Sequence, residues 1–133
     1  MASIHRELQL DIDPSDAWAA VRDYTAVHRR LVPGVLVDTV AEPDARVVTF
    51  ANGLVARELI VSLDDARRRL CWAWVGGQAS HHNASMQVFA GDDGGTRMVW
   101  ITDVLPEALA GPVAELVEQG AAAIRRTLRR STE

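Results

Sequence analysis

Residues 96–130 read TRMVWITDVLPEALAGPVAELVEQGAAAIRRTLRR, and the hydrophobic pattern changes in the middle of this stretch. Residues 96–104 form a short apolar run that follows a cluster of turn residues, which is typical of a strand. From Pro106 to Arg130 apolar residues instead recur at helical spacing, which predicts one long helix. The apolar stripe of this helix contains Leu109, Val113, Leu116, Val117, Gly120, Ile124 and Leu128.

Three features of this helix bear on its shape and packing. At about 1.5 Å per residue it would run roughly 35 Å, which is enough to cross a sheet. Pro112 is expected to break or kink its first turns. Gly120 lies on the apolar stripe, although glycine costs about 1 kcal/mol of helix propensity relative to alanine. We therefore expect Gly120 to serve a close sheet contact or to leave room for a ligand.

Six apolar runs precede this helix, and short segments rich in turn residues separate them. The runs are residues 35–41, 46–51, 54–63, 69–75, 82–90 and 96–104. Asn52-Gly53 is the strongest hairpin signal among the separators. Successive strands that are joined by short turns, with no helix between them, pair as antiparallel neighbours. The pattern therefore argues against a parallel nucleotide-binding sheet.

The N-terminal third predicts a strand and two short helices. Residues 4–12 alternate apolar and polar side chains, as a half-buried strand does. Asp13-Pro14 then begins a helix that ends near Asp23, and residues 25–32 are expected to form a second. The expected class is α+β, with a seven-stranded antiparallel sheet, two short helices between strands one and two, and the long C-terminal helix. Residues 1–133 are expected to form one domain.

Composition and charge exclude several classes of function. The chain is 48% hydrophobic and 24% charged, with a net charge of −4, which argues against a general nucleic-acid binder. No apolar run is long enough for a membrane span, and the N-terminus lacks a secretory signal pattern, so a cytoplasmic location is expected. Cys71 is the single cysteine, and no histidine or carboxylate cluster has ligand spacing. We therefore expect no disulfide, no metal and no other cofactor.

Several local stretches carry a family resemblance. They are Asp16-Ala17-Trp18 with Val21, Val32-Pro33-Gly34-Val35, Arg57-Glu58-Leu59, Arg68-Arg69-Leu70-Cys71-Trp72, and Gly94-Gly95-Thr96-Arg97 with Trp100. Their order and spacing resemble the helix-grip superfamily, which includes START domains and relatives of the birch-pollen allergen. Within it, the chain is similar to the bacterial polyketide cyclase/dehydrase and lipid-transport branch, known as SRPBCC. His28-Arg29-Arg30-Leu31 departs from the family, because many relatives have an aromatic residue there.

The resemblance implies a curved sheet wrapped around the C-terminal helix, with a cavity between them. Some members carry lipids or hormones in this cavity, and others fold and dehydrate polyketides. Because the fold does not select among these functions, they must be separated by the residues that face the cavity.

Alternation along the sixth strand places His82 on the side of Met86, facing the cavity. His82 would then be a polar cavity group or a general base, unless it is simply a hydrogen-bonded strand histidine. His81 points to the opposite side, so the two adjacent histidines cannot share one metal on a regular strand.

Arg57 continues the row of Leu59, Val61 and Leu63 on the fourth strand and is expected to point inward. There it would bind a ligand carboxylate or enolate, or pair with an internal acid. An error of one residue in the register would send Arg57 to solvent and bring Glu58 inward.

Aromatic residues provide the remaining candidates. Trp72, Trp74 and Trp100 are expected on the inner faces of their strands, either as an aromatic wall for a ligand or as ordinary core. Tyr24 and His28 lie where the two short helices would close one end of the cavity, so they are candidates for an entrance.

Three functions remain open. The first is binding of a small apolar molecule, such as a lipid-like, isoprenoid or aromatic polyketide compound. The second is a cofactor-free cyclase, in which His82 or Tyr24 moves protons and Arg57 stabilises enolate charge. The third is a regulatory or interaction module that forms a homodimer.

Overall fold

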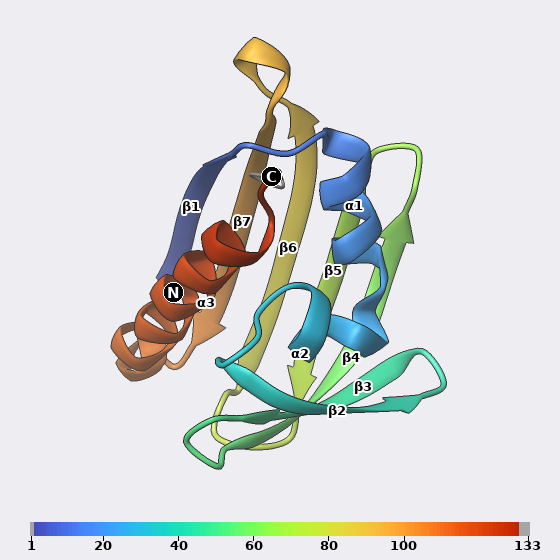
Figure 1. Cartoon of the computed structure of the whole chain (residues 1–133). Coiled ribbons are helices and arrows are strands. Elements are labelled where there is room, and N and C mark those ends of the chain that lie inside the picture. The colour runs from blue at the N-terminus through green and yellow to red at the C-terminus, as the bar shows by residue number, and fades with distance from the viewer. Residues whose placement is uncertain (1, 131–133) are drawn as a thin grey trace.

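The computed structural model describes residues 2–130 and confirms the predicted helix-grip architecture. Seven strands form one antiparallel sheet in the order β1-β7-β6-β5-β4-β3-β2 (Figure 1). The elements are β1 (Ala2–Leu10), α1 (Pro14–Arg22), η1 (Tyr24–Ala26), α2 (Val27–Arg30), β2 (Leu36–Glu42), β3 (Ala45–Phe50), β4 (Val55–Asp64), β5 (Arg69–Val75), β6 (His81–Ala90), η2 (Asp92–Gly94), β7 (Thr96–Leu105), η3 (Glu107–Leu109) and α3 (Ala110–Thr127).

The hairpins form where turn residues separate the apolar runs. In the Asn52-Gly53 turn the Asn52 side-chain oxygen accepts a hydrogen bond from the Leu54 N–H at 2.9 Å, and Gly53 adopts a φ of +91°. That dihedral favours glycine. β1 begins and ends two residues before the predicted range, because its last pairing partner is Thr96, the first residue of β7.

α3 packs against the sheet beside β1 and β7 (Figure 1). It begins at Ala110, later than predicted, because η3 follows Pro106 first. Pro112 therefore lies in the first turn of α3, where its missing N–H breaks no intrahelical bond. The predicted helix does divide in its first turns, into η3 and α3, just before this residue. With 18 residues the helix is about 27 Å long. No helix within residues 2–130 is long and apolar enough to cross a membrane.

β4 contains a bulge that changes which of its residues face inward. Ile60 pairs with Trp72 of β5, whereas Ser62 pairs with Cys71, so Val61 is the extra residue. Val61 is 63% exposed. Because of this extra residue, even-numbered residues of β4 face inward before the bulge and odd-numbered residues face inward after it.

Candidate functional site

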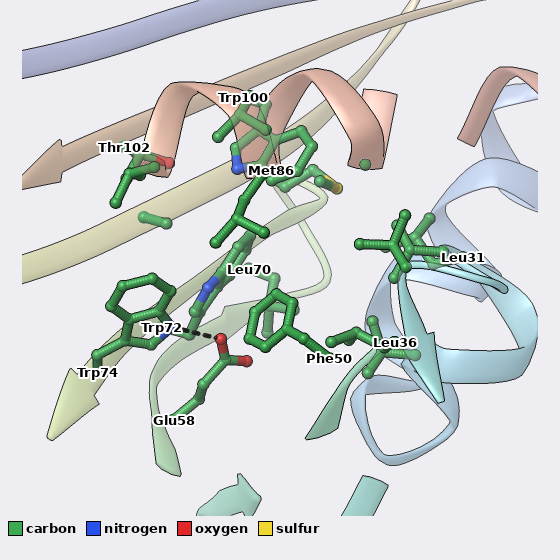
Figure 2. A pocket seen from close by; sticks show the side chains of 18 of the residues that line it. Leu31, Leu36, Phe50, Glu58, Leu70, Trp72, Trp74, Met86, Trp100 and Thr102 are labelled. Atoms are coloured by element: carbon green, nitrogen blue, oxygen red, sulfur yellow. Dashed lines mark hydrogen bonds between the residues drawn. The ribbon is translucent and has the colours of Figure 1, made fainter. Parts of the chain in front are cut away.

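A cavity of about 90 Å³ lies between the inner face of the sheet, α3 and the helix pair α1 and α2 (Figure 2). Its lining is mostly apolar and includes Val21, Leu31, Leu36, Phe50, Leu70, Met86, Val113 and Val117. A single buried water needs about 10–15 Å³, and sites for drug-sized ligands measure about 300–1,000 Å³. The cavity as it stands therefore suits a very small molecule or one part of a larger one.

An outer groove of about 350 Å³ adjoins this cavity. It lies among the start of β4, the turn between β5 and β6, and the start of α3. Trp74, Val113 and Leu116 line both spaces. These three side chains therefore form the boundary between the cavity and the groove.

The structure brings six of the predicted site residues together at the cavity wall. They are Trp72, Trp74, His82, Met86, Trp100 and Gly120. The three tryptophans come from β5 and β7, as their alternation predicted, and His82 comes from β6 beside Met86. Their location is thus as expected, and their role in ligand binding stays a prediction.

Arg57 does not point into the cavity, so the predicted inward orientation is wrong. Its Nε donates to Glu42 Oε1 at 2.8 Å in an exposed ion pair, and the side chain contributes to the outer groove. Glu58 is buried in its place. The physical reason is the bulge at Val61. Leu63 faces inward, but the extra residue reverses the alternation before it, so odd-numbered residues such as Arg57 face outward.

Tyr24 and His28 do not line the cavity. The Tyr24 backbone carbonyl accepts a hydrogen bond from Arg46 Nη1 at 3.1 Å, and His28 Nδ1 lies 2.9 Å from Thr39 Oγ1. Both residues therefore tie the short helical segments to β2 and β3. The boundary with the outer groove is formed by other residues, Trp74, Val113 and Leu116.

Arg46, Glu58, Trp74 and His82 form a buried polar network in the cavity wall. Arg46 Nε donates to Glu58 Oε1 at 2.6 Å, and Trp74 Nε1 donates to Glu58 Oε2 at 2.8 Å, as the dashed line in Figure 2 marks. The Trp74 ring stacks on the His82 imidazole with centroids 4.0 Å apart. The Trp74 backbone N–H donates to His82 Nδ1 at 3.1 Å.

The charges of this network are balanced internally. Burial lowers the pKa of His82 to about 4, outweighing the attraction of the Glu58 and Asp103 carboxylates, so the imidazole is neutral at pH 7. Because Nδ1 accepts a hydrogen bond, the proton of the neutral ring lies on Nε2. The Arg46 cation is compensated by the Glu58 carboxylate.

Arg46 was not predicted as a site residue from the sequence, and Glu58 was predicted to face inward only if the register of its strand differed by one residue. The two residues are directly opposite in the β3–β4 register, so pairing of these strands could have identified them. That signal is usable only once the turn at Asn52-Gly53 has fixed the register.

Gly120 makes the expected close contact with the sheet. A Cβ atom at this position would lie 2.7 Å from Cη2 of Trp100 and 3.0 Å from its Cζ3. The absence of a side chain therefore allows α3 to rest directly on the Trp100 ring.

Replacing Gly120 by alanine is expected to lower the free energy of unfolding by about 1–2 kcal/mol, because overpacking outweighs the gain in helix propensity. Trp100→Phe removes the contacting ring atoms and should reduce this loss in the double variant. Urea denaturation measures both effects. Gly111→Ala is the matched control, since its Cβ would meet no atom within 4 Å. Equal stability of the two alanine variants would contradict the close contact.

The sequence model of the family described as "Polyketide cyclase / dehydrase and lipid transport" matches residues 1–132. No curated protein sequence matches the chain.

Solved structures show the same fold at low sequence identity. The protein XoxI from Bacillus cereus is 13% identical, with a TM-score of 0.86 and 96% of each chain covered. An uncharacterized protein from Bacillus thuringiensis is 12% identical, with a TM-score of 0.85, covering 96% of this chain and 98% of the other. Norcoclaurine synthase from Thalictrum flavum is 18% identical, with a TM-score of 0.72, covering 94% and 84%.

Proposed function

We propose that this chain, which belongs to the polyketide cyclase/dehydrase and lipid transport family, binds a small hydrophobic molecule in the cavity beneath α3. The observation that carries the proposal is the apolar lining of that cavity, whose charged groups are already paired with each other. Lipid-like, isoprenoid and aromatic polyketide compounds all fit this description. The whole chain would act as one domain, in keeping with the family match over residues 1–132.

The outer groove provides the additional room that a larger ligand needs. Trp74 and Leu116 line both spaces, so a ligand that reaches past them would occupy the cavity and the groove together. Trp74 is held in place by Glu58 and His82. Ligands that exceed the cavity would therefore have to pass between Trp74 and the α3 side chains of Val113 and Leu116.

Binding is favoured over proton-transfer catalysis by the state of the two titratable groups in the cavity. The Glu58 carboxylate accepts from Arg46 and Trp74, and His82 Nδ1 accepts from the Trp74 backbone. A general acid or base needs a free position within hydrogen-bond reach of the reacting group. Both Glu58 oxygens already accept hydrogen bonds, and the free nitrogen of His82, Nε2, carries a proton and so has no lone pair with which to act as a base.

Filling the cavity is expected to abolish binding of an apolar probe. Ala84 is 1% exposed and lines the cavity from β6, so Ala84→Leu places three additional carbon atoms in the space. The added carbons take up space that the ligand would otherwise fill, and each ligand methylene that is no longer buried loses about 0.8 kcal/mol of binding free energy. We therefore expect the affinity for α-methylstyrene, measured by calorimetry, to fall at least about tenfold.

The matched control is Ala73→Leu, the same substitution on β5 between the inward-facing Trp72 and Trp74. Because alternate residues of a strand point to opposite faces, this leucine lies outside the cavity and should leave binding unchanged. Equal loss in both variants, or undiminished binding to Ala84→Leu, would argue against the cavity as the site.

A further inference from the structure

We propose that the ligand is an uncharged molecule with a hydrogen-bond-accepting oxygen, such as a ketone, ester or lactone carbonyl, and that the Trp100 indole N–H binds this oxygen. The inference rests on the proposed function and adds to it the chemical class of the ligand.

The Trp100 nitrogen is the first observation. Trp100 is only 9% exposed, and within residues 2–130 its Nε1 is the single buried side-chain nitrogen or oxygen without a hydrogen-bond partner. Leaving a buried donor unpaired costs free energy, and native proteins rarely do so. An indole N–H can only donate, so the missing partner is an acceptor. Figure 2 shows the Trp100 nitrogen on the side of the ring that faces the other cavity residues.

No acceptor of residues 2–130 lies within hydrogen-bond distance of this nitrogen. On the neighbouring strands the residues opposite Trp100 are Arg6 and Met86. Arginine has no acceptor and a thioether is a weak one. On the helix side the ring rests on Gly120, which has no side chain. Because the nitrogen is buried, an acceptor reaches it only when a neighbouring cavity side chain rotates.

The charge balance of the cavity selects a neutral ligand. Arg46 is the only cation in the lining, and its charge is compensated by Glu58 at 2.6 Å. His82 is neutral and can add a second donor through Nε2. A carboxylate ligand would have to be buried without a free cation, which is costly.

Three planar compounds of nearly the same shape separate these contributions. α-Methylstyrene carries a CH₂ group where acetophenone carries the carbonyl oxygen, and benzoate carries a full negative charge. Their dissociation constants are measured by calorimetry at pH 7 for the wild type, Trp100→Phe and Trp18→Phe. The Trp18 variant is the control, because Trp18 is a buried indole whose Nε1 donates to Asp65 and which does not line the cavity.

The preference for acetophenone over α-methylstyrene is expected to fall about three- to tenfold in Trp100→Phe, the effect of losing one hydrogen bond. Trp18→Phe should retain the wild-type preference. Benzoate should bind the wild type more weakly than acetophenone. In ¹⁵N-edited NMR spectra, acetophenone should shift the Trp100 indole resonance, which is assigned in the wild type itself by triple-resonance experiments.

The possible results distinguish failure of this inference from failure of the proposed function. An unchanged preference in Trp100→Phe, or tighter binding of benzoate than of acetophenone, would overturn this inference while leaving an apolar binding site in place. Failure of all three compounds to bind the wild type would instead count against the proposed function. If Trp100→Phe does not fold, the wild-type NMR spectrum decides, because an unshifted Trp100 resonance in the presence of bound acetophenone overturns the assignment.

Discussion

Arg46→Met is expected to lower the free energy of unfolding by about 3–5 kcal/mol, because it leaves the Glu58 carboxylate buried without its cation. Both side chains are buried, with exposed fractions of 4% and 6%. The substitution also removes the hydrogen bond to the Tyr24 carbonyl and the stacking of the guanidinium over Trp72, 5.4 Å from the ring centroid. Urea denaturation monitored by circular dichroism measures the loss.

Arg57→Met is the matched control, since it breaks the arginine–glutamate pair with Glu42 on the exposed face of the same sheet. Exposed pairs contribute at most about 1 kcal/mol, so this variant should remain close to the wild type. Arg46→Met/Glu58→Gln removes the unpaired charge and keeps an acceptor for Trp74, so it should recover much of the stability. Similar losses in Arg46→Met and Arg57→Met would contradict the importance of burial.

Acidification from pH 6.5 to pH 4 is expected to destabilise the wild type by about 2–3 kcal/mol through His82 alone, given its pKa of about 4 in the folded state. In the unfolded chain a histidine titrates near pH 6.5, so between these values the unfolded state binds a proton that the folded state excludes. The contribution is therefore complete above pH 6.5 and is lost progressively as the pH falls to 4.

His82→Phe removes this titration and should flatten the pH dependence between 4 and 6.5, whatever its own stability. His81→Phe is the control, because His81 is exposed on the adjacent position of β6 and should leave the slope intact. The slopes come from unfolding free energies measured at several pH values. Equal slopes for the wild type and His82→Phe would show that His82 is not held neutral by the fold.

Much of the fold could be predicted because each strand is a separate apolar run bounded by turn residues. The order of six such runs before one long helical stripe left the antiparallel meander as the simple solution. The ends of the helices and strands were predicted less accurately than their order, because the local sequence does not determine them. α3 begins after Pro106 and a short 3-10 turn, and the sequence pattern alone does not separate that turn from the helix.

The candidate site could be predicted only in part, because strand alternation gives the facing of residues but not their partners. It placed Trp72, Trp74 and His82 correctly on the cavity side. It failed for Arg57, since a bulge leaves no clear mark in a run of apolar residues. The unpaired nitrogen of Trp100 was also beyond reach, because an absent partner is a property of the packed structure.

The bulge in β4 also bears on how this chain can change in evolution. Val61 is exposed and has no pairing partner in β5, so a lineage that loses this residue would restore a regular strand with every cavity side chain still facing inward. Loss of Leu59 instead would also remove the bulge and keep Glu58 inward, but Val61 would then face inward in place of Ile60. A one-residue deletion in β4 is therefore expected to be tolerated best at Val61 itself, where no inward-facing side chain is exchanged.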